Sequence, residues 1–362
     1  MKKKLFLGLL AAAAVTFTAC QKDEVINEVP QDQAIEFGTY VGRDAQTKAS
    51  VTDLDAMKLE PYEGFGVFAY YTGETEYDNS ATSAFMHNVN VDYSTTWSYT
   101  NPKFWPGKTD DYKISFFAYA PFNKSEITVP SGPITGDPTI DFTTPDMANQ
   151  YDLLYATPVM NTYYDDDTKI SDGTVEFTFK HALSRIGLKA ATARTDYKVT
   201  ISSVVIVGKF KKSGTLNLNT GDWDNNNAAD NATTYTLNTF ANATNLSSTT
   251  GVAITPDNQY LMIIPTDLDT APNKVSVTVN YSYQYKVGEG ATNDPGDDEY
   301  AAAVSVSETG TVGIDFVKGN AYTLVFTLDP LQPIQFSVNE STGVTGWNPV
   351  GDIDTPVTTT LP

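Results

Sequence analysis

Cysteine and histidine are almost missing from this chain. Its 362 residues contain one cysteine, Cys20, and two histidines, His87 and His181. A lone cysteine has no partner in the chain for a disulfide, and two histidines are too few for the multi-histidine metal sites of enzymes. We therefore predict no catalytic residue, no metal site and no cofactor.

Basic residues are also scarce. The chain has 23 lysines and arginines against 44 acidic residues, a net charge of −21, and loss of the three lysines near the start brings it to −24. Such a charge repels nucleic acid and anionic lipid headgroups, so we expect neither as a partner. A pair of carboxylates of the glycosidase type stays open among so many acids, but nothing in the sequence singles one out.

Long apolar runs are missing except at the start. Residues 5–15 are apolar, follow three lysines, and are too few to span a bilayer, which is typical of a cleaved export signal. Cys20 follows small residues at the end of this segment, as in a lipobox. We predict a signal peptide over 1–19, acylation of the Cys20 thiol, for example with palmitate, and a lipidated tether over 20–33; a free thiol is the alternative.

The four residues after the cysteine suggest where the lipoprotein goes. Gln21-Lys22-Asp23-Glu24 resembles the tag that directs lipoproteins of the Bacteroidetes to the outer face of the outer membrane. The alternative is an acidic, solvated tether. On the first interpretation the lipid anchors the precursor in the outer membrane, at the cell surface.

Apolar and polar residues alternate over 34–42, which predicts a strand with one buried side. Arg43 and Lys48 follow in a polar segment, where a protease finds an accessible basic residue. Ordinary loop charges are the alternative. The apolar face of the strand carries Ile35, Phe37, Thr39 and Val41.

The remaining chain alternates with period two, is rich in aromatic residues and lacks convincing helical periodicity, which predicts an all-β sandwich protein. We place an N-terminal β-sandwich over 34–172, a C-terminal β-sandwich over 173–347 and a tail over 348–362. The last clear alternation carries Ile334, Phe336 and Val338.

Three features have competing interpretations. The aromatic group around Trp97 and Trp105 is expected to pack in a core, with a sugar-binding platform as the alternative. His181 lies among strand residues and is expected to make a structural polar contact. Residues 222–226 have the alternating oxygens of a calcium loop but lack its glycine and its final glutamate, so we favour a solvated turn.

Several segments together resemble one family. WSYTNPKFWP, YKISFFAYAP, VEFTFKHALSRIGL and GNAYTLVF, followed by Trp347, are similar in order and spacing to the fimbrillin-like, or type V pilin, family of the Bacteroidales. The resemblance implies two antiparallel transthyretin-like β-sandwich domains in tandem. It also implies export as a lipoprotein and assembly with other fimbrial subunits, in a homo- or hetero-polymer, by β-strand addition that supports adhesion.

The same resemblance assigns roles to residues. A cut after Arg43, with Lys48 as the second candidate, would release the strand carrying Ile35, Phe37 and Val41 and open a groove for a donor strand. The donor would come from the C-terminal region, either the strand with Ile334, Phe336 and Val338 or the tail over 348–362. In an anchor subunit the first strand would instead stay in place.

Two other functions compete with the fimbrial one. A surface glycan-binding lipoprotein of a polysaccharide-uptake system would also be β-rich and lipid-tethered. A surface hydrolase is the third possibility. Cleavage at Arg43 or Lys48 followed by polymerisation separates the fimbrial subunit from both.

Overall fold

The computed structural model describes residues 33–41, 64–107, 112–122, 124–165, 170–224, 232–247, 249–256, 260–289 and 298–340. These residues form strands and one 3-10 turn, η1 (Met147–Asn149), without an α-helix, so the all-β prediction is confirmed. No described helix is long and apolar enough to cross a membrane. The strands are β1 (Glu36–Val41), β2 (Phe65–Gly73), β3 (Met86–Tyr93), β4 (Trp97–Ser98), β5 (Lys113–Ala120), β6 (Ile127–Thr128), β7 (Thr139–Thr143), β8 (Leu154–Ala156), β9 (Val159–Thr162), β10 (Thr174–His181), β11 (Ser184–Thr192), β12 (Tyr197–Gly208), β13 (Ser213–Asn217), β14 (Trp223–Asp224), β15 (Thr233–Leu237), β16 (Val252–Ala253), β17 (Leu261–Ile263), β18 (Thr266–Leu268), β19 (Val275–Gly288), β20 (Glu299–Tyr300), β21 (Val304–Val312), β22 (Ile314–Phe316), β23 (Ala321–Asp329) and β24 (Gln332–Glu340).

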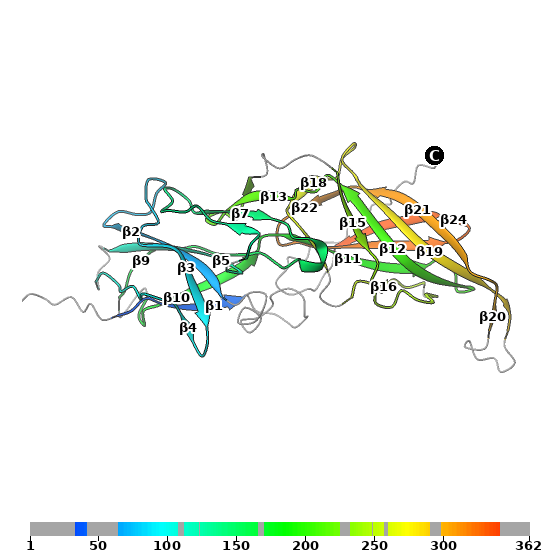
Figure 1. The fold of residues 1–362 in the computed structure, drawn as a ribbon, viewed down its shortest axis with the longest axis horizontal. Coiled ribbons are helices and arrows are strands. Elements are labelled where there is room, and N and C mark those ends of the chain that lie inside the picture. The colour runs from blue at the N-terminus through cyan, green and yellow to red at the C-terminus, as the bar shows by residue number, and fades with distance from the viewer. Residues whose placement is uncertain are drawn as a thin grey trace, which may run out of the picture.

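The strands form an elongated molecule with two lobes that lie end to end (Figure 1). The first lobe contains an eight-stranded sheet, β1-β10-β8-β5-β2-β3-β4 with β9 on β5, and a four-stranded sheet, β14-β13-β7-β6. The second lobe contains two five-stranded sheets, β16-β11-β23-β24 with β17 on β11, and β15-β12-β19-β20 with β21 on β19. The short pair β18-β22 completes it.

The central strands of the first lobe are buried on both faces. Phe68 and Phe117 pack with Phe142 of the four-stranded sheet on one face, while Phe65 and Phe116 lie in a separate core on the other. The run FGVFAY has few polar residues to expose, and all six of its residues are buried. A strand covered on both sides reads as a continuous apolar run.

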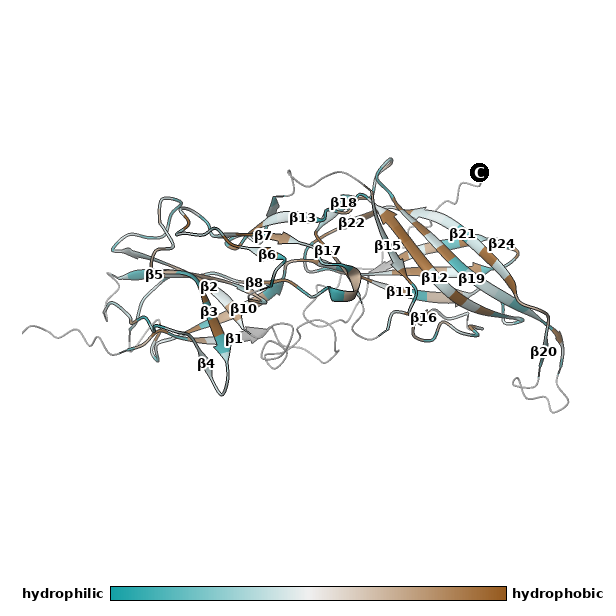
Figure 2. Ribbon diagram, in the orientation of Figure 1, coloured by the Kyte–Doolittle hydropathy of each residue, from teal (hydrophilic) through white to brown (hydrophobic). Residues whose placement is uncertain are grey.

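The second lobe follows the period-two pattern closely. β12 and β19 alternate buried and partly exposed residues because one face packs against the opposite sheet. Hydrophobic residues recur along β12 in Figure 2. Their buried side chains join those of β23 and β24 in one core.

Two of the sheets each contain one parallel strand pairing. β1 pairs with β10, and β11 with β23, in parallel, whereas every other strand pairing described is antiparallel. The described sheets are thus antiparallel, as predicted, except at these two pairings. Both pairs join strands far apart in the sequence, so no hairpin imposes the antiparallel direction.

Strand pairing also crosses the predicted boundary between residues 172 and 173. β10 begins at Thr174, yet it pairs with β1 and β8 of the first lobe. β13 likewise pairs with β7. The first lobe therefore takes in strands from beyond the boundary, and the division into two domains stays a prediction.

Candidate functional site

The first strand, β1, occupies the edge of the eight-stranded sheet. All six of its residues pair in parallel with β10, from Glu36 beside Thr174 to Val41 beside Phe179. No other sheet strand pairs with it among the described residues. Its hydrogen-bonded neighbour within the sheet is therefore β10 alone.

The residues leading into β1 touch the opposite end of the same sheet. The amide of Ile35 donates to the carbonyl oxygen of Lys103 at 2.8 Å, and that of Trp105 donates to the carbonyl oxygen of Gln33 at 3.1 Å. Residues 103–105 follow β4, the last strand in the sheet order. The start of β1 thus lies between the two ends of the sheet and helps to close it around its core.

The side chains of β1 and of Ile35, which directly precedes it, alternate as the sequence predicts. Ile35, Phe37 and Thr39 are buried at 1%, 5% and 5% exposure, while Glu36 is exposed. Burial of a large apolar side chain contributes about 1.5–3 kcal/mol. We call the slot that receives these side chains the seat of β1; its aromatic lining is Phe65, Tyr99, Phe116 and Phe177.

Phe37 lies at the centre of this seat. Its ring stacks on that of Phe177, with centroids 5.8 Å apart and planes 9° apart. Tyr99 lies 5.4 Å away, and its hydroxyl donates to the carbonyl oxygen of Ile35 at 2.9 Å. Burial raises the pKa of that hydroxyl, so Tyr99 remains a donor.

A glycine turn fixes the start of the strand. The carbonyl oxygen of Gly173 accepts hydrogen bonds from the amide of Glu36 and from the indole nitrogen of Trp105, both at 3.1 Å. Gly173 has a φ of +83°, and a Cβ there would lie 2.2 Å from the side chain of Gln33. Glycine therefore meets both a backbone and a packing requirement here.

The seat has one polar defect. The hydroxyl oxygen of Thr39 is buried and has no hydrogen-bond partner among the residues that the structure describes. On the outer face of β10, burial and the nearby Asp172 raise the pKa of Glu176, whose side chain lies over Gly38. The inward face of β1 is thus apolar at Ile35 and Phe37 and unsatisfied at Thr39.

The structure places some of the predicted site residues and not others. Ile35 and Phe37 line the seat, and Val41 is the last residue of β1. Cys20, Arg43, Lys48 and the tail over 348–362 lie outside the described residues. Their predicted roles stay predictions.

The candidate donor residues lie in β24, at the edge of a sheet in the second lobe. Ile334, Phe336 and Val338 are buried at 1%, 4% and 8% exposure. The Phe336 ring packs on Phe326 at 6.0 Å and lies against Gly310. β24 therefore fills its own sandwich, with β23 as its hydrogen-bonded neighbour in the sheet.

The other interpreted features have structural roles where they are described. Trp105 is buried in the core beside Phe116, as expected, and Trp97 packs against that core. His181 contacts the buried carboxylate of Asp152. The two residues lie 29 positions apart, so no local pattern could have predicted this pair.

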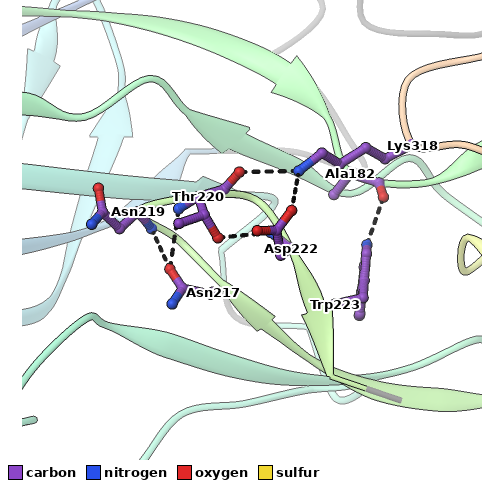
Figure 3. Close-up of polar contacts among 7 residues, drawn as sticks. All are labelled: Ala182, Asn217, Asn219, Thr220, Asp222, Trp223 and Lys318. Atoms are coloured by element: carbon purple, nitrogen blue, oxygen red, sulfur yellow. Dashed lines mark hydrogen bonds and ion pairs between the residues drawn. The ribbon is translucent and has the colours of Figure 1, made fainter.

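The sequence predicts a solvated turn over 222–226; residues 225–226 lie outside the described part of the chain, and Trp223–Asp224 form β14. The described residues contact the second lobe. Asp222 pairs with Lys318 at 2.9 Å, and the indole nitrogen of Trp223 donates to the carbonyl oxygen of Ala182 at 2.8 Å (Figure 3). In the described part of the chain, no three His, Cys, Asp or Glu side chains are grouped to hold a metal ion. Asp222 is thus engaged in an ion pair with the second lobe.

The model of the fimbrillin-like family matches residues 47–347. The chain belongs to this fimbrillin-like family. The resemblance inferred from the sequence is thereby confirmed.

Relatives of this fimbrillin-like chain include the fimbrium subunit Fim1C of Phocaeicola vulgatus, which is 26% identical over 96% of the chain and 97% of its own length. A proposed cell adhesion protein from Bacteroides ovatus is 17% identical, with a TM-score of 0.48, over 85% of this chain and 96% of that one. The fimbrial anchor protein Mfa2 from Porphyromonas gingivalis is 11% identical, with a TM-score of 0.35, over 85% and 97%.

Proposed function

We propose that the chain is the lipoprotein precursor of a fimbrial subunit and that subunits join by strand exchange once β1 has been removed. The observation that carries this proposal is the seat of β1. An apolar edge strand fills an aromatic slot in a parallel pairing, and its loss would leave both the slot and one edge of β10 open. Such an edge accepts a strand from another chain.

The covalent layout suits a removable strand. Arg43 comes two residues after the end of β1, and Lys48 seven residues after it. A cut after either residue leaves β1 on a fragment held by hydrogen bonds and side-chain packing alone. The fragment would carry Cys20 and its lipid away and so free the subunit from the outer membrane.

Apolar burial and backbone pairing must drive the assembly, because like charge opposes it. Subunits cut after Arg43 keep a net charge of −21 and repel one another, while a strand inserted in the seat buries apolar side chains and satisfies the amides and carbonyls of β10. Assembly should therefore accelerate with salt, which screens the repulsion.

An arginine-specific protease tests the proposal. Treated protein should lose the residues up to Arg43 and then form a ladder of oligomers on gels. Arg43→Ala should stay monomeric if the cut is at that residue, and Lys48→Ala serves as the matched control. Treated protein that is cleaved yet stays monomeric would contradict strand exchange.

The lipid is tested separately. Cells given labelled palmitate should incorporate the label into the intact chain, and Cys20→Ser should abolish incorporation. The same variant should be lost from the outer-membrane fraction. Label that persists in Cys20→Ser would contradict acylation of that thiol.

A further inference from the structure

We propose that Thr39 keeps β1 a weak occupant of its own seat, and that the seat prefers a strand with an aliphatic side chain in the place of Thr39. The C-terminal strand β24 of a second copy has that pattern. This inference rests on the proposed function, because it concerns which strand replaces β1. It names the residue that makes the replacement favourable.

The hydroxyl of Thr39 is the reason. Thr39 is 5% exposed and lies beside Phe177 in the parallel register. Within the described part of the chain, its hydroxyl oxygen has no hydrogen-bond partner. A buried hydroxyl without a hydrogen bond loses its water and gains nothing in return. Valine has nearly the same shape without that group. An aliphatic residue in this position should therefore bind the seat more tightly.

The sequence of β24 fits the seat at three successive inward positions. β1 presents Ile35, Phe37 and Thr39 at alternate positions, and β24 presents Ile334, Phe336 and Val338 with the same spacing. With Phe336 in the place of Phe37, the aromatic lining meets the side chain it already surrounds. The unsatisfied hydroxyl is replaced by a methyl group.

The match holds for either strand direction. The pattern of β24 is an aromatic residue with an aliphatic residue two positions to each side. If the incoming strand runs as β1 does, Val338 takes the place of Thr39; if it runs in the opposite direction, Ile334 does. The tail over 348–362 has only Thr355 between Ile353 and Val357, so no aromatic side chain would fill the centre.

A subunit that donates β24 loses that strand's contacts with β23 and with Phe326 in its own lobe. A free peptide with the sequence of β24 has no such contacts to lose, so its affinity for the seat can be compared directly with that of a β1 peptide. The preference of the seat is therefore best measured with peptides, and the donation with whole subunits.

The first test measures how fast the fragment leaves after cleavage. In Thr39→Val protein its release should be about tenfold slower than in the parent. Thr39→Ser keeps the hydroxyl and should release at least as fast as the parent. Thr178→Val, on the exposed face of β10, is the matched control and should leave the rate unchanged.

The second test uses cleaved protein freed of its fragment. A peptide of residues 332–340 should bind about tenfold more tightly than one of residues 33–41, and the change of both Ile334 and Val338 to threonine should abolish the advantage. Equal affinities, or a tighter complex with a peptide of residues 348–362, would overturn the inference. If β24 enters in the direction of β1, Ser337 takes the place of Gly38, so whole subunits should then cross-link through a cysteine in place of Ser337 of the donor and one in place of Glu176 on β10 of the acceptor.

The outcomes separate the two claims. If the parent fragment never leaves after cleavage, the proposed strand exchange fails. If it leaves, but at the same rate as in Thr39→Val, the exchange stands and the role of Thr39 is wrong.

Discussion

Replacing Phe37 by alanine in the uncleaved protein measures how firmly the seat holds β1. The Phe37 side chain is 5% exposed and packs among four aromatic rings with centroids 5.4 to 6.3 Å away. Deleting such a ring loses its transfer free energy and leaves a cavity that a rigid aromatic lining cannot refill. The free energy of unfolding of the first lobe should fall by about 3–5 kcal/mol.

Phe104→Ala is the control, because Phe104 lies in the neighbouring segment, bridges Ala34 through the backbone and is 48% exposed. Its effect should stay below about 1 kcal/mol. Urea unfolding followed by tryptophan fluorescence reports on the seat, since Trp105 is buried in the core that Phe37 joins. If Phe37→Ala destabilises the protein no more than Phe104→Ala, β1 is not held by its side chains and the reasoning fails.

Three further substitutions test other parts of the structure. Asp152→Ala removes the carboxylate that a buried histidine contacts and should lower the free energy of unfolding by about 3 kcal/mol, measured by urea unfolding. Gly310→Ala places a Cβ 2.4 Å from the Phe336 ring and should cost about 1–3 kcal/mol and increase hydrogen exchange in β24; unchanged exchange would contradict the packing. Burial raises the pKa of the Glu308 carboxyl, so the folded protein binds this proton more tightly than the unfolded chain does. The free energy of unfolding therefore falls as the pH rises from the pKa in the unfolded chain, about 4.3, through the pKa in the folded protein. Glu308→Gln should therefore unfold at higher urea than the parent at pH 7 and lose that advantage below the unfolded pKa, whereas a constant difference would contradict it.

Local alternation predicted the strands better than it predicted their partners. The period of two from Ile35 to Thr39 identifies both β1 and its buried face, because one-sided burial leaves that pattern in a strand. The parallel direction of β1 could not be inferred, since its partner β10 lies more than 130 residues away in the chain. The contact of Gln33 with Trp105 has no sequence signal either.

The sequence of a strand also does not always show which of its faces are buried, or in which core. The run from Phe65 to Tyr70 is equally consistent with one sheet face and with two, because apolar residues fill every position. In β24 the alternation of Ile334, Phe336 and Val338 shows a buried face correctly, but it does not show which core the face enters. The structure places it in the second lobe, where it contacts Phe326.

The family resemblance supplied what residue patterns alone could not. The order of the aromatic segments points to the fimbrillin-like family, which the match over 47–347 confirms. That match begins after β1, so the structure, rather than the family match, shows how Phe37 and Ile35 close the first core.

Mass spectrometry of the assembled polymers shows whether β1 leaves its subunit when subunits join. The protein is cleaved with an arginine-specific protease, and monomers and polymers are separated by size before the peptides in each are counted. The fragment containing Ile35 and Phe37 should remain with monomers that have not yet exchanged and should be absent from the interior of polymers. Polymers that retain one such fragment per subunit would show that β1 is a permanent strand and would contradict the account.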